Sequence, residues 1–196
     1  MSTVPDTSAD ASASAARSVL LALALSLGAA VSLGITRFAY GLLLPVMRED
    51  LDWGYTLAGA MNTANAGGYL LGALATPWLM RRFGTARVLL AGAVLASGFM
   101  AASGFFPAAG PLLLQRLLAG VASAFVFVAG GLLAARLGAQ APQHAGLLLG
   151  LYYGGTGWGI SASALAVPGL LRAAADVPHG WSWAWGGLAL LCLLAT

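Results

Sequence analysis

The stretch at residues 111–135, PLLLQRLLAGVASAFVFVAGGLLAA, contains one charged side chain, that of Arg116. An apolar run of about 20 residues is long enough to cross the hydrocarbon core of a bilayer as an α-helix. Similar runs occupy residues 18–47, 55–80, 88–106, 145–171 and 181–196. We therefore predict an all-α membrane protein in which six transmembrane helices form one bundle.

The composition of the whole chain agrees with this prediction. Of the 196 residues, 60% are hydrophobic and 8% are charged, and the mean hydropathy is +0.86. An ordinary soluble domain has about 25% charged residues, so this chain has too few charges to cover a surface that faces water. The lipid bilayer is the expected partner. The net charge of +3 is spread between apolar runs, which excludes a nucleic-acid-binding patch.

The two ends of the chain differ from its middle. Residues 1–17 are mainly Ser, Ala, Thr and Asp, and bury too little apolar surface to offset the entropy of ordering. We predict a disordered cytoplasmic tail there and one transmembrane bundle over residues 18–196. The run at 181–196 is short and ends while still apolar, so we expect the sixth helix to be truncated.

The arginines outside the apolar runs predict the orientation. A cytoplasmic N-terminus places five of them inside and two outside, as the positive-inside rule requires. The five are Arg17, Arg81, Arg82, Arg87 and Arg136, and the two are Arg48 and Arg172.

Two further arginines, Arg37 and Arg116, lie within the apolar runs. Each costs about 2.5–3.5 kcal/mol at a helix centre. All six acidic residues lie outside the runs: Asp6, Asp10, Glu49, Asp50, Asp52 and Asp176. The two arginines could extend to the outer interface, pair with a carboxylate elsewhere in the protein, or border a wet passage that admits an anionic ligand.

Polar side chains in four of the runs fall on one face of each helix when they are plotted at 100° per residue. They are Arg37 and Tyr40 in the first run, Asn62, Asn65 and Tyr69 in the second, Arg116 in the fourth, and Tyr152 and Thr156 in the fifth. Each such row of polar side chains on one helix face forms a stripe. Hydrogen bonds between helices would account for any single stripe. Four stripes together favour a pathway for a solute, lined by these residues.

Glycines spaced by four residues predict close helix packing in the second and fifth runs. They are Gly68 and Gly72, and Gly146, Gly150 and Gly154. The same device in these two runs favours an inverted repeat of three plus three helices. Enzyme chemistry finds little support, since His144, His179 and Cys192 have no metal-ligand spacing and no catalytic triad or phosphate-binding loop is present. We expect no enzyme activity, cofactor or metal.

Residues 34–72, GITRFAYGLLLPVMREDLDWGYTLAGAMNTANAGGYLLG, resemble the N-terminal half of a major facilitator superfamily (MFS) transporter, most closely its YbfB/YjiJ-type branch. Leu44, Pro45 and Met47 before an acidic loop resemble the end of the family's first helix, and Arg116 with Gly120 resembles the R-x-x-x-G of its fourth. The resemblance implies a multi-pass protein of the bacterial inner membrane. It also implies a C-terminal half that this chain lacks, and alternating access to a site between the halves.

The loop between the second and third runs resembles the family's conformational loop through Arg82, Gly84 and Arg87. Arg81 stands where the family usually has Asp, so we expect this loop to latch the two halves differently. The resemblance associates Arg116 with proton coupling. The sequence therefore predicts a secondary transporter of a small organic solute, anionic and proton-coupled. The alternative is a non-transporting six-helix membrane module or an inactive truncated half-transporter.

Overall fold

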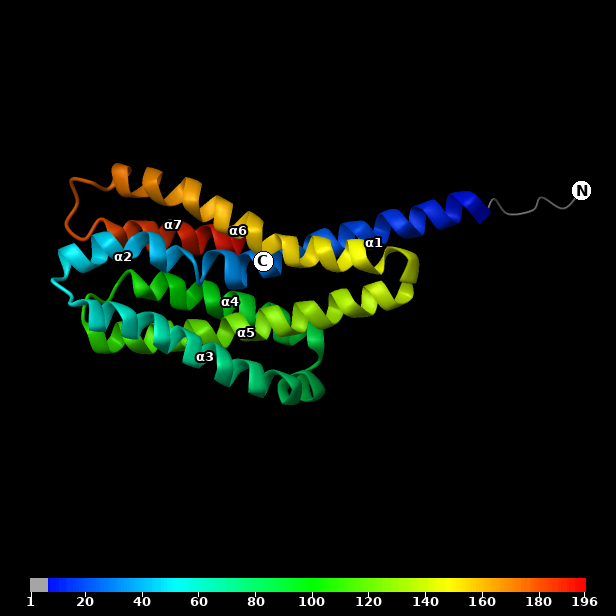
Figure 1. Cartoon of the computed structure of the whole chain (residues 1–196), viewed down its shortest axis with the longest axis horizontal. Helices are drawn as coiled ribbons and strands as arrows, with labels where there is room; N and C mark the ends of the chain where they lie inside the picture. Colours follow the sequence, from blue (N-terminus) through cyan, green and yellow to red (C-terminus); the bar gives the residue numbers. More distant parts are fainter. Residues whose placement is uncertain (1–6) are drawn as a thin grey trace, which may run out of the picture.

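The computed structural model describes residues 7–196, which form helices joined by short turns (Figure 1). The elements are α1 (Thr7–Ala29), the π-helix η1 (Ala30–Ile35), α2 (Ala39–Asp50), α3 (Tyr55–Phe83), α4 (Thr85–Ser103), α5 (Ala109–Gln140), the 3-10 helix η2 (Pro142–His144), α6 (Ala145–Ala173) and α7 (Trp181–Leu194). No strand occurs among these residues. Because α1, η1 and α2 follow one another as one interrupted helix, the described residues form six helical segments in the predicted order, and the all-α class is confirmed.

The first span begins earlier than the sequence predicted. Helix α1 begins at Thr7, so the part of the predicted disordered tail that the structure describes is helical. Residues 1–6 lie outside the described residues. Alanine is the strongest helix former, and an Ala-rich stretch can extend a helix that the following apolar residues have already nucleated.

Successive spans run in opposite directions along the bundle. The connections that follow α2, α4 and α6 lie at one end, and those that follow α3 and α5 lie at the end nearer the N-terminus (Figure 1). Three helices of the described chain are long and apolar enough to cross a membrane: Ser14–Asp50, Thr85–Ser103 and Ala109–Gln140. This up-and-down course is the one expected of a multi-pass membrane protein.

Helices α3 and α5 cross at close range. A Cβ atom added at Gly68 would collide with the backbone carbonyl of Leu117, and one added at Gly72 would collide with Val121. Glycine lets the two backbones approach this closely because it has no side chain. The close-packing role predicted for Gly68 and Gly72 is confirmed.

Helix α6 crosses the first span in the same way, but through other glycines than the sequence predicted. A Cβ atom at Gly155 would collide with the carbonyl of Ser26, and one at Gly159 would collide with that of Ala30. The three predicted glycines have open space where a Cβ would stand: Gly146, Gly150 and Gly154. That prediction was wrong, because the packed face is displaced by one residue, or about 100° around the helix.

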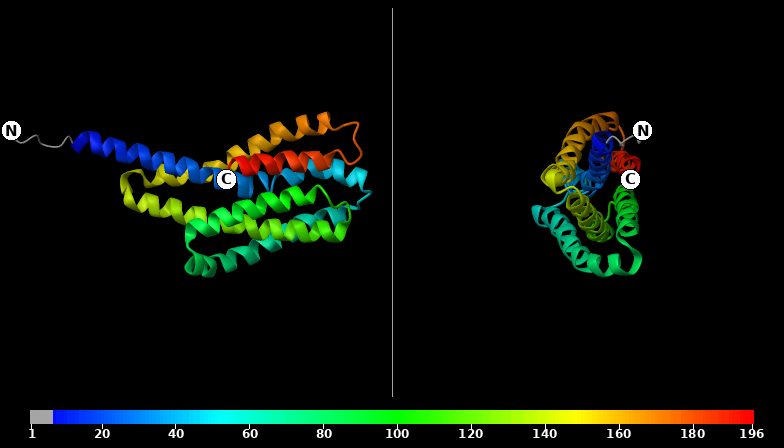
Figure 2. Two further views of the ribbon diagram at one scale, coloured as in Figure 1. Left: turned by 180° about the vertical axis from the view of Figure 1, so that it is seen from behind. Right: turned by 90° about the vertical axis from the view of Figure 1, so that its right-hand side faces the viewer.

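The two crossings are related. One joins the second span to the fourth, and the other joins the fifth span to the first. An inverted repeat of three plus three spans exchanges the first with the fourth and the second with the fifth, so it maps one crossing onto the other. In agreement, α3 and α6 lie at opposite sides of the bundle, both from the side (Figure 1) and along its length (Figure 2).

Candidate functional site

The first span is broken near its middle. The helix passes into the π-helix Ala30–Ile35, and residues 36–38 form a turn before α2 begins at Ala39. The hydroxyl and the amide of Thr36 both donate to the carbonyl of Val31, at 2.7 and 3.0 Å. Irregular backbone at membrane depth is tolerated where it is buried in protein or lines a cavity, and broken helices often hold transporter sites. The sequence predicted one unbroken helix here.

Arg37 lies in this turn. Its side chain is half-buried, and its guanidinium carbon is 5.9 Å from the ring centroid of Tyr69 on α3. Within residues 14–196 no carboxylate forms an ion pair with Arg37. The break therefore presents a cation that is partly accessible and is covered on one side by an aromatic ring.

Arg116 on α5 is enclosed by protein, with 1% of its surface exposed. Its Nη1 donates to the carbonyl of Thr36 at 3.3 Å, and its guanidinium carbon lies 4.7 Å from the ring centroid of Tyr40 and 5.6 Å from that of Trp185. Its Nε and Nη2 have no hydrogen-bond partner in the described chain. The structure therefore does not show Arg116 extended to the outer interface, which was one of the three alternatives given above.

Two cationic residues lie at the turn, because Arg37 is part of it and Arg116 Nη1 donates to the carbonyl of the preceding residue, Thr36. No acidic side chain of the described spans offsets them, because the acids that follow residue 13 lie at α2's end or in loops. In a medium of low dielectric constant such charges interact much more strongly than in water. The break is thus an electropositive centre between α3, α5 and α7.

Asn65 and Tyr40 make hydrogen bonds between helices. The Nδ2 of Asn65 donates to the carbonyl of Arg116 at 2.9 Å, and the Tyr40 hydroxyl donates to the carbonyl of Ala58 at 2.9 Å. Each side chain is 2% exposed. Asn62, from the same predicted stripe as Asn65, is exposed instead. The stripe of α3 therefore divides into a buried part that packs on α5 and an exposed part.

Helix α6 contributes two adjacent tyrosines. Tyr152 is fully buried and its hydroxyl donates to the carbonyl of Phe127 at 2.7 Å. Tyr153 is 52% exposed, with its ring centroid 5.0 Å from that of Tyr152 and 5.8 Å from that of Phe127. Thr156 is half-buried, and its backbone carbonyl lies at the close approach of α6 to Gly34. The sequence analysis missed Tyr153, because the helical projection placed it about 100° away from Tyr152.

The basic loop between α3 and α4 lies at the end of the bundle opposite the α2–α3 connection (Figure 1). Arg81, Arg82 and Arg87 are exposed, and the Arg82 guanidinium carbon is 5.6 Å from the ring centroid of Phe83. Gly84 has φ 89°, a conformation that side chains with a Cβ rarely adopt, so the turn requires glycine.

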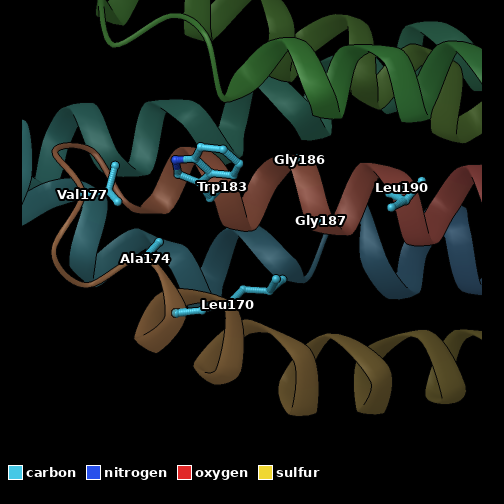
Figure 3. Close-up of a pocket in the computed structure, with 8 residues that line it drawn as sticks. Leu170, Ala174, Val177, Trp183, Gly186, Gly187 and Leu190 are labelled. Carbon is cyan, nitrogen blue, oxygen red and sulfur yellow. The ribbon is translucent and has the colours of Figure 1, made fainter.

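A groove of about 540 Å³ lies between α6 and α7 (Figure 3). Leu170, Val177, Trp183 and Leu190 line it, and none of its lining residues is charged. It does not supply the cation that an anionic solute needs. Nor do three His, Cys, Asp or Glu side chains of the described chain lie close enough together to hold a metal ion.

A bundle of six helices with an interrupted first helix and two arginines within apolar runs agrees with the architecture of a membrane transporter. Residues 29–196 match the family described as "Uncharacterised MFS-type transporter YbfB", and the chain belongs to this family. The match includes both arginines and every helix from η1 onward. The predicted resemblance is therefore confirmed. A search of curated proteins finds no match to the chain.

Proposed function

We propose that this chain is part of a secondary active transporter, and not an enzyme, and that it moves a small organic anion in a proton-coupled cycle. The observation that carries the proposal is that two arginines lie at one turn, Arg37 within it and Arg116 bonded to the carbonyl of Thr36, and that neither forms an ion pair within residues 14–196. A guanidinium binds a carboxylate through two parallel hydrogen bonds, which fix both charge and orientation. A membrane site with two such groups favours anions over neutral solutes.

In this proposal the bundle works by alternating access. A second bundle, the C-terminal half of the transporter, completes the site, and rocking of one bundle against the other exposes Arg37 to either side in turn. The N-terminus is cytoplasmic, in the inner membrane of a bacterium, and the loop with Arg81, Arg82, Gly84 and Arg87 contacts the second bundle on the cytoplasmic side. Besides Arg37 and Arg116, the residues assigned to the pathway are Tyr40, Asn62, Asn65, Tyr69, Tyr152 and Thr156.

Proton coupling needs a group that titrates. Arginine remains protonated at all physiological pH values. The two histidines, His144 and His179, lie in the connections between helices, and the acidic residues that follow residue 13 lie at the end of α2 or in loops. We therefore place the titrating group of the cycle on the second bundle, where it would act together with Arg116.

The test is Arg37→Gln in the intact transporter, reconstituted in proteoliposomes and supplied with a panel of anionic and neutral solutes. Loss of one member of a charge pair that is out of water should weaken anion binding by about 30-fold or more. Arg48→Gln is the matched control, because Arg48 also stacks on a tyrosine, Tyr55, but lies at the end of α2. Unchanged transport of every anion in the Arg37 variant would contradict the proposal.

The alternative is a membrane module that does not transport. It predicts no movement of any solute under any imposed ion gradient, although the reconstituted protein is folded. The same proteoliposome panel therefore separates the two functions.

A further inference from the structure

We propose that a phospholipid with an anionic headgroup binds in a groove between α3 and α4, with its phosphate at Arg87 and an acyl chain along the apolar wall. The groove lies beside the turn that joins the two helices, at the end of the bundle opposite the α2–α3 connection (Figure 1). The inference goes beyond the proposed function, because it concerns the membrane around the protein and not the solute.

The groove has a volume of about 370 Å³, and three helices line it. Leu79 and Phe83 belong to α3, Phe125 belongs to α5, and the other lining residues belong to α4. Helix α4 packs closely on α5 here, since a Cβ atom added at Gly92 would lie 2.8 Å from the Cβ of Phe125. The groove is therefore a feature of the packed bundle and not of a single helix.

The wall on α4 begins at a cation and continues as apolar surface. Arg87, Ala91 and Leu95 are spaced by four residues, so they share one face of the helix. All three are exposed, and Arg87 alone is charged among the residues that line the groove. Eight residues of α-helix rise about 12 Å. An acyl chain that follows this face therefore extends about 12 Å inward from the guanidinium.

Arg87 lies at the depth where headgroups are expected. It is in the first turn of α4, which is long and apolar enough to cross a membrane. Arginines near the ends of membrane-spanning helices extend to the interface, where their charge meets lipid phosphates. The guanidinium also forms paired hydrogen bonds with phosphate oxygens. The phosphate of a lipid whose chain occupies the groove would therefore meet Arg87.

Further positive charge surrounds this position. The guanidinium carbon of Arg82 is 5.6 Å from the ring centroid of Phe83, which lines the groove. Helix α4 begins after Gly84 without a side-chain cap, so its first N–H groups and the positive end of its dipole add to the charge. Residues 53–175 contain no Asp or Glu. An anion that balances these charges therefore does not come from α3, α4, α5 or α6.

Other grooves of the described chain show the same association with the basic end. A groove of about 300 Å³ between α1 and α5 lies at this end, and Leu21, Leu133 and Arg136 are among its lining residues. The groove between α6 and α7 lies near the opposite end, and its lining residues are uncharged (Figure 3). In the orientation proposed above, the basic end lies in the cytoplasmic leaflet, where anionic lipids attract basic groups.

Both parts of the groove are needed to decide what occupies it. A neutral lipid would use the apolar wall but not the cations, and a free phosphate ion would use the cations but not the wall. An anionic phospholipid uses both, as basic pockets between membrane-spanning helices do. Arg81 does not line the groove, and it remains for the contact with the second bundle proposed above.

The test uses the intact transporter in phosphatidylcholine vesicles that contain a small fraction of phosphatidylglycerol with a photoreactive group in its acyl chain. After illumination, peptide mass spectrometry should locate the label at Ala91 and Leu95. Arg87→Gln should reduce this labelling by about fivefold, the effect of one charge near an anionic surface, and Arg87→Lys should keep most of it. Arg172→Gln is the matched control, because Arg172 is an exposed arginine at the opposite end of the bundle.

A second pair of variants tests the apolar wall. Ala91→Trp fills the groove and should reduce labelling of Leu95, although Arg87 is still present. Leu90→Trp places the same side chain on the next residue, which is exposed but does not line the groove, and should leave the labelling unchanged. The unfolding midpoint of each variant in neutral lipid checks that it is folded.

Each contrary result overturns a stated part of the inference. Equal labelling by phosphatidylcholine with the same photoreactive group would overturn the preference for an anionic headgroup. Labelling that persists in Arg87→Gln, or falls as far in Arg172→Gln, would overturn the role of Arg87. Normal labelling of Leu95 in Ala91→Trp would overturn the role of the wall. If neither lipid labels α4 in the folded protein, the groove is covered by the second bundle and the inference is wrong.

Discussion

Arg116 donates a hydrogen bond from Nη1 to the carbonyl of Thr36 at 3.3 Å, and Thr36 is the residue at which the first span breaks. One bond of this length does not satisfy a guanidinium with five N–H donors, and Nε and Nη2 have no partner in the described chain. Helix α5 binds the break a second time, since the Ser123 hydroxyl donates to the Ser32 carbonyl at 2.5 Å. The broken segment is therefore attached to α5 at two levels.

We expect Arg116→Met to abolish anion transport while changing stability by no more than about 1 kcal/mol. The substitution loses one hydrogen bond and the contacts with two rings, but it removes a buried cation that costs about 2.5–3.5 kcal/mol at membrane depth. Thermal unfolding in detergent, measured beside uptake in proteoliposomes, checks both parts. If Arg116 only braced the turn, the substitution would lower the free energy of unfolding by more than about 1 kcal/mol and would leave anion transport intact.

Asn65 and Asn62 give a second comparison. Asn65→Ala should lower stability by about 0.6–1.7 kcal/mol, the range for hydrogen bonds between transmembrane helices, because its bond to the Arg116 carbonyl joins α3 to α5. Asn62→Ala should leave the unfolding midpoint unchanged, because Asn62 is exposed, and should raise KM if Asn62 contacts the solute. Equal unfolding midpoints for the two variants would show that burial does not distinguish their roles.

The sequence predicted the all-α class because hydropathy over about 20 residues is a strong signal, and three helices of the described residues are themselves long and apolar enough to cross a membrane. It did not predict the break at residues 36–38, where no proline occurs and where the π-helix depends on contacts with α5 and α6. Tertiary contacts can override a local helical pattern. The one sequence feature that pointed to the break was Arg37 within the apolar run.

The sequence indicates which charged residues the candidate site contains, but not which of its side chains are buried. The absence of acids from the spans singled out Arg37 and Arg116 in advance. A helical projection treats every residue of a stripe alike, whereas the structure buries Asn65 and exposes Asn62. Which neighbour covers a given face depends on how the spans are packed, and the projection does not contain that information.

Gly155 and Gly154 are adjacent, but they should respond in opposite ways to alanine. A Cβ at Gly155 would collide with the Ser26 carbonyl, so Gly155→Ala must push α6 away from the first span and should reduce the yield of folded protein. Gly154 has open space at that position, so Gly154→Ala should stabilise α6 by about 0.5–1 kcal/mol. Size-exclusion profiles and unfolding midpoints of the two variants check the crossing. A Gly155→Ala variant as stable as the wild type would contradict it.

Asp50 at the end of α2 accepts hydrogen bonds from His179 Nδ1 and from Trp181 Nε1, each at 2.5 Å. These two bonds join the end of the first span to the start of the sixth. The His179 side chain is 48% exposed, so its ion pair contributes little, about 0–1 kcal/mol. Trp181 is 1% exposed, and an indole N–H left without a partner there costs about 1–3 kcal/mol. The bond to Trp181 should therefore outweigh the ion pair.

Asp50→Ala should accordingly lower the free energy of unfolding by about 1–3 kcal/mol, measured by thermal unfolding in detergent. The control is His179→Asn, because His179 has φ 55°, which asparagine tolerates better than alanine does. This variant removes the ion pair alone, and it should change stability by less than about 1 kcal/mol. A loss of stability in His179→Asn as large as that in Asp50→Ala would mean that the ion pair, and not the buried indole, holds the two spans together.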